Sequence, residues 1–325
     1  MAVPTAYSAG STTGGNKYNN VVEAFYNDIG QSYLWEMIAN LDIQNAAAKR
    51  VYAENPVGDI PTWNGTSDLT AIATGATHTT SVSGVIYGGR ITHNEIDVRR
   101  DPALISTSAA RLAEATKRKF EKLVFTRLMA AFTETVDDGN ESTTEVCSAA
   151  HKITGAASQS NLLTSALTAS TLGDAREVMA GWKSWQNEPL GLDKYPMVLV
   201  VNPANGDLAR RLVGSPQHFQ SVGTASGGAT GAQINPMNQG MNPERSITVL
   251  ESAYAVEAGG DTDSWFLMNK AGADKRSPLT LWLPTLPDFQ IMRDAKSRLW
   301  EISVVFEALA HWRAPVDGIV GSNPT

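Results

Sequence analysis

The chain has 325 residues and a formal net charge of −7, with 42% hydrophobic and 18% charged residues. This composition is that of an ordered protein with a sizeable core, which argues against global disorder. The negative charge argues against a protein that grips nucleic acid over its whole surface, and no apolar run approaches the roughly 20 residues of a membrane span.

The N-terminal part of the sequence predicts a polar arm followed by a helix. Residues 1–28 are rich in Gly, Ser, Thr and Asn and have too few apolar side chains to order by themselves. We expect this arm to take its backbone hydrogen bonds from a neighbouring subunit. In residues 21–50 the apolar side chains, among them Leu34, Met37 and Leu41, recur at helical spacing, which predicts a short helix.

Residues 51–100 are predicted to form an extended loop and a hairpin. Residues 54–80 have the Gly, Pro, Asn and Thr content of a loop, whereas residues 82–98 read as extended structure interrupted at Gly88-Gly89. In the second half of this extended stretch, polar side chains alternate onto both faces, which does not suit a core strand. The pattern favours a two-stranded ribbon that projects from the subunit and lies on another molecule.

The longest helical pattern begins at Asp101, which is placed to cap it, with Pro102 in the first turn. No further Pro or Gly follows before Gly139. A helix of roughly 35 residues would be ~50 Å long. That length is typical of a strut.

One basic cluster lies in this predicted helix, at Lys117, Arg118, Lys119 and Lys122, with Arg127 farther along. It can be the solvated face of an amphipathic helix. It can also be an electrostatic face that meets acidic residues of a neighbour or packaged DNA, with contacts that do not depend on nucleotide sequence. The sequence leaves both interpretations open.

Four segments follow one another between Asp137 and Val213. They are DDGNESTTEVCSAAH (137–151), SQSNLLTSALTASTL (158–172), a helical stretch ending in EPLGL (188–192), and YPMVLVVNPANGDLARRLV (195–213). The second supplies an N-cap for a helix at Thr168, Ser170 or Thr171. The fourth begins with the apolar run Met197–Val201, typical of a strand covered on both faces, and then resumes helical spacing.

The last third of the sequence predicts a loop and several strands. Gly, Ser, Asn and Pro dominate residues 214–243, which read as a loop. Short strands are predicted at 246–250, 264–268 and 279–283. In residues 300–308 apolar and polar side chains alternate, which predicts a half-buried strand.

These segments, in this order, resemble the major capsid proteins of tailed bacteriophages, most closely the branch typified by the head subunit of phage Mu. The resemblance covers about residues 85–318 and includes Asn242-Pro243, Trp265-Phe266-Leu267, Pro278-Leu279 and Trp312-Arg313. It implies an α+β, Hong Kong 97-type capsid fold with an N-terminal arm, a projecting β-hairpin (E-loop), a long spine helix, a peripheral domain and a central axial domain.

The resemblance also divides the chain into five parts. These are the arm and short helix (1–50), the extended loop or hairpin (51–100), the spine helix with part of the peripheral domain (101–190), the axial domain (191–300), and a closing peripheral strand with the C-terminus (301–325). We further expect the chain to lack the large N-terminal scaffolding segment that many phage capsid proteins carry.

The implied function is that of a major capsid (head) protein, which self-assembles into homo-hexamers and homo-pentamers of an icosahedral shell enclosing double-stranded DNA. The expected partners are further copies of the chain, a portal, separate scaffolding or decoration proteins, and packaged DNA by non-specific proximity. No membrane partner is expected. The implied location is the virion, with assembly in the cytoplasm of the host bacterium.

The sequence shows no arrangement typical of catalysis or cofactor binding. Its five histidines have no metal-ligand spacing, and residues 223–231 lack the Lys-Ser/Thr end of a phosphate-binding loop. The single cysteine, Cys147, precedes His151 by four residues, but no papain- or caspase-type motif surrounds it. We therefore predict no enzymatic activity, no cofactor and no structural metal.

Six residues are candidate contacts between subunits. Trp63 and Trp312 lie in segments expected at the subunit surface, and tryptophan is enriched at interface hot spots. Arg90, Arg99, Arg100 and Asp101 lie where the hairpin meets the long helix, and arginine suits bidentate pairing with carboxylates. No intrachain partners for this charged group are evident from the sequence.

Two alternatives to the phage capsid interpretation stay open. An encapsulin-like bacterial nanocompartment shell protein would share the fold. A soluble α/β enzyme with an unrecognised site would belong to a different class, and it would run as a compact monomer or small oligomer rather than as large particles.

Overall fold

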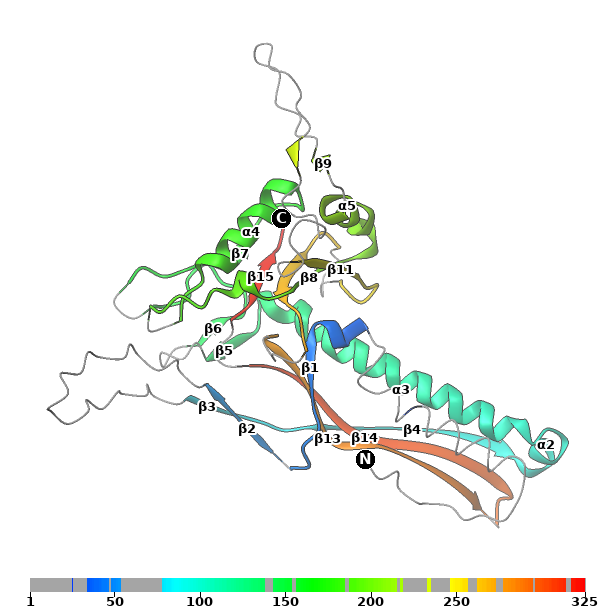
Figure 1. Cartoon of the computed structure of the whole chain (residues 1–325). Coiled ribbons are helices and arrows are strands. Elements are labelled where there is room, and N and C mark those ends of the chain that lie inside the picture. Colours follow the sequence, from blue (N-terminus) through cyan, green and yellow to red (C-terminus); the bar gives the residue numbers. More distant parts are fainter. Residues whose placement is uncertain are drawn as a thin grey trace, which may run out of the picture.

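The computed structural model describes fourteen stretches of the chain. They are residues 25, 34–46, 48–53, 78–137, 143–153, 156–184, 187–214, 217–218, 233–234, 246–256, 262–272, 277–294, 296–313 and 317–324. Two β-sheets and one long helix dominate these residues (Figure 1). One sheet lies alongside the long helix in an elongated arm, and the other lies at the end of that helix with two shorter helices.

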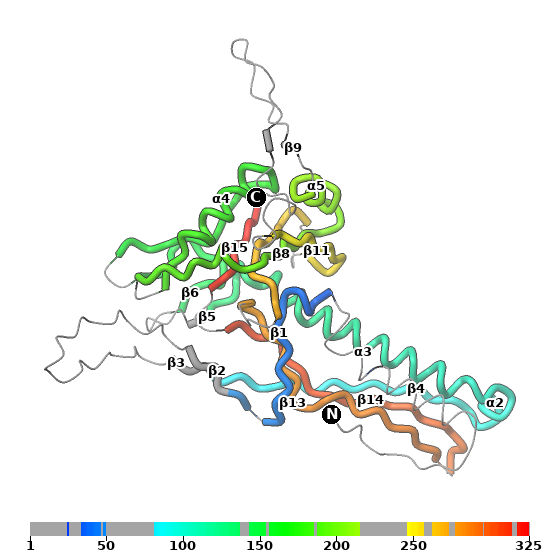
Figure 2. Tube along the Cα trace, viewed as in Figure 1, coloured from blue at the N-terminus to red at the C-terminus, as the bar shows by residue number. Residues whose placement is uncertain are grey.

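The elongated arm contains a four-stranded sheet in the order β1-β13-β14-β4. Its strands are β1 (Ala39–Asp42), β13 (Leu279–Asp294), β14 (Leu299–Trp312) and β4 (Val85–Asn94). β1 pairs parallel with β13, whereas β14 pairs antiparallel with both β13 and β4. Figure 2 shows how segments from both ends of the chain lie side by side in this sheet.

The long helix α3 (Ala103–Met129) lies along one face of this sheet. It begins at Ala103, one residue later than predicted, with Pro102 as the N-cap residue; the Asp101 carboxylate accepts a hydrogen bond from the Ala103 amide at 3.0 Å. Its 27 residues span about 40 Å, less than the predicted ~50 Å. A 3-10 turn, η2 (Ala130–Phe132), ends it before the short antiparallel pair β5 (Thr135–Asp137) and β6 (Thr143–Glu145).

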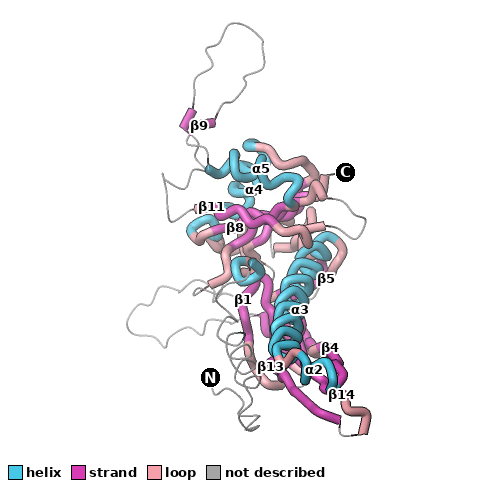
Figure 3. Tube along the Cα trace, turned by 90° about the vertical axis from the view of Figure 1, so that its right-hand side faces the viewer, coloured by secondary structure: helices cyan, strands magenta, loops and turns pink. Residues whose placement is uncertain are grey.

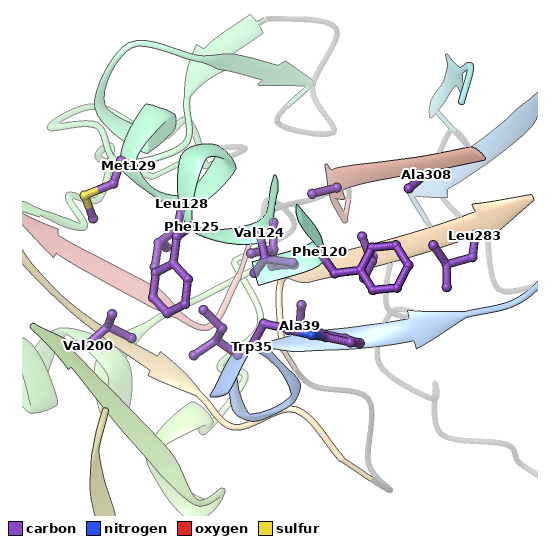
Figure 4. Packing of buried hydrophobic residues seen from close by; sticks show 14 of the residues in the cluster. Trp35, Ala39, Phe120, Val124, Phe125, Leu128, Met129, Val200, Leu283 and Ala308 are labelled. Atoms are coloured by element: carbon purple, nitrogen blue, oxygen red, sulfur yellow. The ribbon is translucent and has the colours of Figure 1, made fainter. Parts of the chain in front are cut away.

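The main core forms where α3 meets the sheet (Figure 4). Eight apolar side chains of the helix are buried there: Ala109, Leu112, Ala113, Phe120, Val124, Phe125, Leu128 and Met129. The buried side chains of β14 follow the predicted alternation, Ile302, Val304, Phe306 and Ala308. The half-buried strand predicted at 300–308 is therefore confirmed, within a longer element.

The prediction that residues 82–98 form a projecting ribbon is wrong for most of that stretch. β4 pairs with β14 along its whole length, and Gly88-Gly89 does not interrupt it. The chain continues from β4 into α2 (Glu95–Arg100). Asn94 caps this helix, because its side-chain oxygen accepts a hydrogen bond from the Ile96 amide at 3.1 Å. One face of β4 does meet α3, through a 2.7 Å contact between His93 Nε2 and Ser108 Oγ. The other face lies open and carries exposed Ile86, Arg90 and Thr92.

A two-stranded ribbon does exist, earlier in the chain. It pairs β2 (Lys49–Ala53) antiparallel with β3 (His78–Val82), so the end of the predicted loop 54–80 is a strand. Residues 54–77, which link the two strands, lie outside the described residues, as does most of the predicted arm 1–28.

The helix predicted within residues 21–50 is wrong for the described residues 39–42 and 49–50, which form strands. Only a 3-10 turn, η1 (Leu34–Met37), and helical residue 25 are found among the described residues of that stretch. β1 and β2 follow instead, because pairing of β1 with β13 satisfies its backbone and buries Ile38 and Ala39.

The second sheet has five strands in the order β11-β8-β12-β15-β7. They are β11 (Ile247–Glu251), β8 (Met197–Val201), β12 (Trp265–Asn269), β15 (Ile319–Ser322) and β7 (Leu162–Leu163). β8 is buried throughout, as predicted. Met197, Leu199 and Val201 pack with the shorter helices, whereas Val198 and Val200 face the main core.

Two helices cover the outer face of this sheet, on the side away from α3 (Figure 3). α4 (Ala169–Gly181) is capped by Thr168, one of the three predicted caps, in a reciprocal arrangement with Thr171. α5 (Pro203–Gly214) begins at the predicted stop of β8. A short turn η3 (Leu192–Lys194) precedes β8, and β9 (Gln217–His218) pairs with β10 (Gln233–Ile234).

The predicted division into parts 101–190, 191–300 and 301–325 does not follow the sheets. β15 belongs to the five-stranded sheet and α4 packs on it, whereas β13 belongs to the four-stranded sheet. β13 also continues past the predicted end at Leu283, because two register shifts accommodate Pro284 and Pro287. Each sheet is thus built from distant stretches of the chain.

Candidate functional site

The free end of the elongated arm carries a cluster of arginines around one carboxylate. Glu95, at the start of α2, accepts hydrogen bonds from Arg99 at 2.6 Å and from Arg293 at 2.8 Å, both through Oε1. Arg298 contributes its charge, and its carbonyl accepts the Glu95 amide at 3.0 Å. Partial burial acts to raise the pKa of Glu95, but the Arg99 hydrogen bond and the three arginine charges outweigh it and lower that pKa.

This free end of the arm, called the tip below, carries more arginine side chains than take part in its internal ion pairs. Arg100 and Arg298 are exposed and make no ion pair with any described residue. Arg90 makes one long contact, 3.4 Å, with Glu301 of β14. The tip therefore presents free guanidinium groups to solvent, and such groups pair well with carboxylates of another molecule.

The structure corrects part of the predicted contact set. Arg90 and Arg99 do have intrachain partners, Glu301 and Glu95, which the sequence did not reveal. Asp101 caps the start of α3 with its carboxylate. Of the predicted charged group, Arg100 is the residue left most available for another subunit.

The structure removes Trp312 from the candidate surface anchors. Trp312 is only 5% exposed, and its Nε1 donates to Glu134 Oε2 at 3.0 Å. It is buried because it lies at the end of β14, opposite Leu279 of β13, within the main core. Trp63 lies outside the described residues.

The predicted electrostatic face on α3 divides between different sides of the helix. Lys117 Nζ lies 5.8 Å from the ring centroid of Phe25, and Lys119 Nζ lies 4.3 Å from that of Tyr87. These two lysines are half-buried against aromatic rings. Only Arg118 and Lys122 remain exposed, one turn apart.

A surface that the sequence analysis missed is the face of the four-stranded sheet opposite α3. It exposes Ile86 (72%), Met292 (52%) and Val305 (49%), one from each of its three long strands. The alternation along β14 could have revealed this surface, because Val305 must lie on the face opposite that of buried Val304 and Phe306. These three apolar side chains are spread along the strands among charged ones such as Arg90 and Glu301, so they do not form one apolar patch.

The residues considered for catalysis are held in structural roles. Cys147 is fully buried, and burial raises the pKa of its thiol well above the usual range, so it stays protonated. His151 Nε2 lies 2.9 Å from Asn161 Oδ1, and its ring meets Trp182 edge-on. Within the described residues, no group of three or more His, Cys, Asp or Glu side chains could hold a metal ion. No described helix is long and apolar enough to cross a membrane.

Comparisons with known proteins bear on this fold. A family model described as phage capsid protein matches residues 79–313. No curated protein sequence matches the chain. Among solved structures, the mature capsid of bacteriophage PhiM1 aligns with a TM-score of 0.55 at 12% identity, covering 91% of this chain and 87% of that one.

Two further structures align similarly. The capsid of Ralstonia phage GP4 has a TM-score of 0.56 at 14% identity and 90% coverage of both chains. A virus-like particle from Pyrococcus furiosus has a TM-score of 0.52 at 10% identity, covering 96% of this chain and 100% of that one. At these identities the alignments establish the fold, an α+β fold of the capsid type, across nearly the whole chain.

Proposed function

This chain belongs to the phage capsid protein family, and from that premise we propose that it is the major head subunit of a tailed bacteriophage. In this proposal it self-assembles into homo-hexamers and homo-pentamers of an icosahedral shell around double-stranded DNA. The observation that carries the proposal is the family match across residues 79–313, which span α3 and most strands of both sheets. The elongated shape supports the proposal, because the open surfaces of a long, narrow subunit would be buried against neighbouring subunits in a shell.

The parts of the shell subunit are assigned as follows. α3 is the spine helix, the four-stranded sheet belongs to the peripheral domain, and the five-stranded sheet with α4 and α5 is the axial domain. The β2–β3 pair is the root of the projecting hairpin, and residues 1–28 are the N-terminal arm. The support is the topology, in which β2 and β3 lie outside both larger sheets and are joined by 54–77.

The proposed branch is that of the Mu-type head subunit. The support is the order of the four segments between Asp137 and Val213, which now correspond to β6, β7, α4 and the β8–α5 unit. The proposed further partners are a portal, separate scaffolding or decoration proteins, and the packaged DNA. The chain would be a virion component assembled in the host cytoplasm, without enzymatic activity of its own.

The exposed pair Arg118 and Lys122 on α3 is the proposed non-specific contact with DNA. Two cations one turn apart would follow phosphates without reading bases. Glu114 and Glu121 on the same helix limit the net charge there, which suits weak contact rather than tight binding.

Electron microscopy of the purified full-length protein tests the proposed function. We expect closed particles of megadalton mass, because many open subunit surfaces would be buried together in a shell. A compact monomer or small oligomer at high concentration would contradict the proposal. Particles that never contain DNA when produced with the other head proteins would instead favour a nanocompartment.

Reversing the charge of Arg100 should impair assembly without unfolding the subunit. Arg100 is exposed and has no ion-pair partner among the described residues, so Arg100→Glu removes no internal contact. We expect the unfolding free energy of the free subunit to change by less than about 0.5 kcal/mol. Particle yield should fall at least about tenfold, because like charges across an interface cost several kcal/mol.

Arg100→Lys is the matched control for this variant. It keeps the charge and loses bidentate geometry, so it should assemble better than Arg100→Glu. Arg99→Glu is less informative, since it also breaks the contact with Glu95. A normal particle yield from Arg100→Glu would show that the tip of the arm does not contact another subunit.

A further inference from the structure

The two helices on the outer face of the five-stranded sheet lie over opposite halves of it. α5 packs against β11 and β8, at one end of the strand order, whereas α4 packs against β12 and β15. Figure 1 shows α4 and α5 on the two sides of this end of the subunit. The subunit therefore presents a different helix on each of these two sides, and such a subunit can meet a second copy head to tail.

α4 carries two unpaired carboxylates on its solvent side, called the acidic flank below. Asp174 and Glu177 are exposed and lie about one turn apart, opposite the side chains that face the sheet, which are Leu172, Ala175 and Met179. Neither carboxylate makes an ion pair with a residue that the structure describes. Arg176 follows between them in sequence but lies on another side of the helix and is half-buried. Because like charges one turn apart repel each other, a cation from another molecule would stabilise both.

α5 carries an unpaired arginine on its solvent side, called the basic flank below. Arg210 is used inside the subunit, since it donates to Asp207 at 2.7 Å and also pairs with Glu251 of β11. Arg211 is exposed as well, but it makes no ion pair with any described side chain. Leu208, one turn before Arg211, is 41% exposed. An arginine that is free to bind carboxylates, next to an exposed apolar side chain, is typical of a protein contact.

We propose that the acidic flank of one subunit binds the basic flank of the next, with Arg211 of one copy between Asp174 and Glu177 of the other. The contact is head to tail, so it can repeat around a closed ring in which every subunit uses each flank once. This inference rests on the proposed capsid function, and it names the surfaces through which hexamers and pentamers would close.

Only contact between unlike flanks matches the charges. α4 against α4 would bring the carboxylates of two copies together, and α5 against α5 would bring their arginines together, both of which are unfavourable. α4 against α5 instead places an unpaired cation opposite two unpaired anions. A pair of copies related by a two-fold axis could also match α4 with α5, but it would close after two subunits rather than form a ring.

Charge reversal tests the contact, with particle yield measured by electron microscopy and size-exclusion chromatography. Arg211→Glu alone should lower the yield at least about tenfold, and so should Asp174→Lys combined with Glu177→Lys, because each brings like charges together. All three changes in one chain restore opposite charges and should recover most of the wild-type yield. Arg211→Lys, which keeps the charge, is the matched control and should assemble better than Arg211→Glu.

Disulfide cross-linking separates a ring from a two-fold pair, and it does not depend on the charge variants. Glu177→Cys and Arg211→Cys in one chain, oxidised with oxidised glutathione after assembly, should give a ladder of linked chains that ends at pentamers and hexamers. Native Cys147 is fully buried and should not react. Each single-cysteine variant is a control and should stay monomeric on a non-reducing gel, because position 177 meets position 211 of the next copy rather than itself.

The possible outcomes separate this contact from the proposed function. Wild-type protein that forms neither particles nor rings would contradict both. Particles that tolerate Arg211→Glu, or that the triple variant fails to recover, would overturn the contact and leave the proposed function standing. A double-cysteine chain that gives only monomers or dimers from intact particles would do the same.

Discussion

Replacing Phe120 with Ala should destabilise the subunit by about 3–5 kcal/mol, the usual cost of deleting a fully buried phenylalanine side chain. Phe120 has no exposed surface, and its ring meets Phe306 edge-on with centroids 5.2 Å apart. Figure 4 shows it in the buried cluster with Leu283 and Ala308, where α3 meets the sheet. The truncation would leave a cavity at the contact that holds the long helix to the sheet.

Urea denaturation of the free subunit measures this loss. Ile86→Ala, on the open face of the same sheet, is the control, and its unfolding free energy should change by less than about 0.5 kcal/mol. If that face is buried between subunits, Ile86→Ala should weaken the particle while leaving the free subunit intact. A loss below about 1 kcal/mol for Phe120→Ala would show that α3 is not held mainly by this core.

Gly321→Ala should destabilise the subunit, with a loss near the upper end of about 1–3 kcal/mol for overpacking. Gly321 lies on β15 between Phe266 of β12 and Leu162 of β7. A Cβ at this position would lie 2.7 Å from Cys147 Sγ and 2.9 Å from Phe132 Cε1. The phenyl rings of Phe132 and Phe266 stack here, so neither can move away freely.

Gly181→Ala is the matched control, because a Cβ at Gly181 meets nothing within 4 Å. It should leave stability unchanged or raise it by up to about 1 kcal/mol, since alanine favours the helix. Adding Cys147→Ala to Gly321→Ala should recover part of the loss by removing the sulfur atom. A thermal melt in which Gly321→Ala equals Gly181→Ala would contradict the close packing at β15.

Much of the fold could be predicted from local sequence patterns. The strand at Met197–Val201 follows from five consecutive apolar residues, and all five are buried. The start of α3 follows from Asp101 and Pro102, and the start of α4 from a threonine cap that was among the predicted candidates. These features depend on side chains close together in sequence, so a pattern of burial or capping is visible without knowing the partner.

The contact site was predictable only in part. The sequence pointed to the arginines near the start of the long helix, and the structure places them at the tip of the arm. It could not show that Glu95 pairs with Arg293, because these residues lie 198 positions apart in the sequence and meet only in the folded chain. Trp312 looked like a surface residue for the same reason, since the core that buries it is assembled from distant strands.

The sequence by itself therefore determined the long helix, the buried strands and the family, because periodicity, caps and motif order are properties of neighbouring residues. Only the tertiary structure decided which strands pair and which distant side chains contact one another. Residues 39–42 have helical spacing yet form a strand, because pairing with β13 satisfies their backbone better than an isolated helical turn could. Likewise β4 is an edge strand rather than a free ribbon because β14 is long enough to pair with all of it.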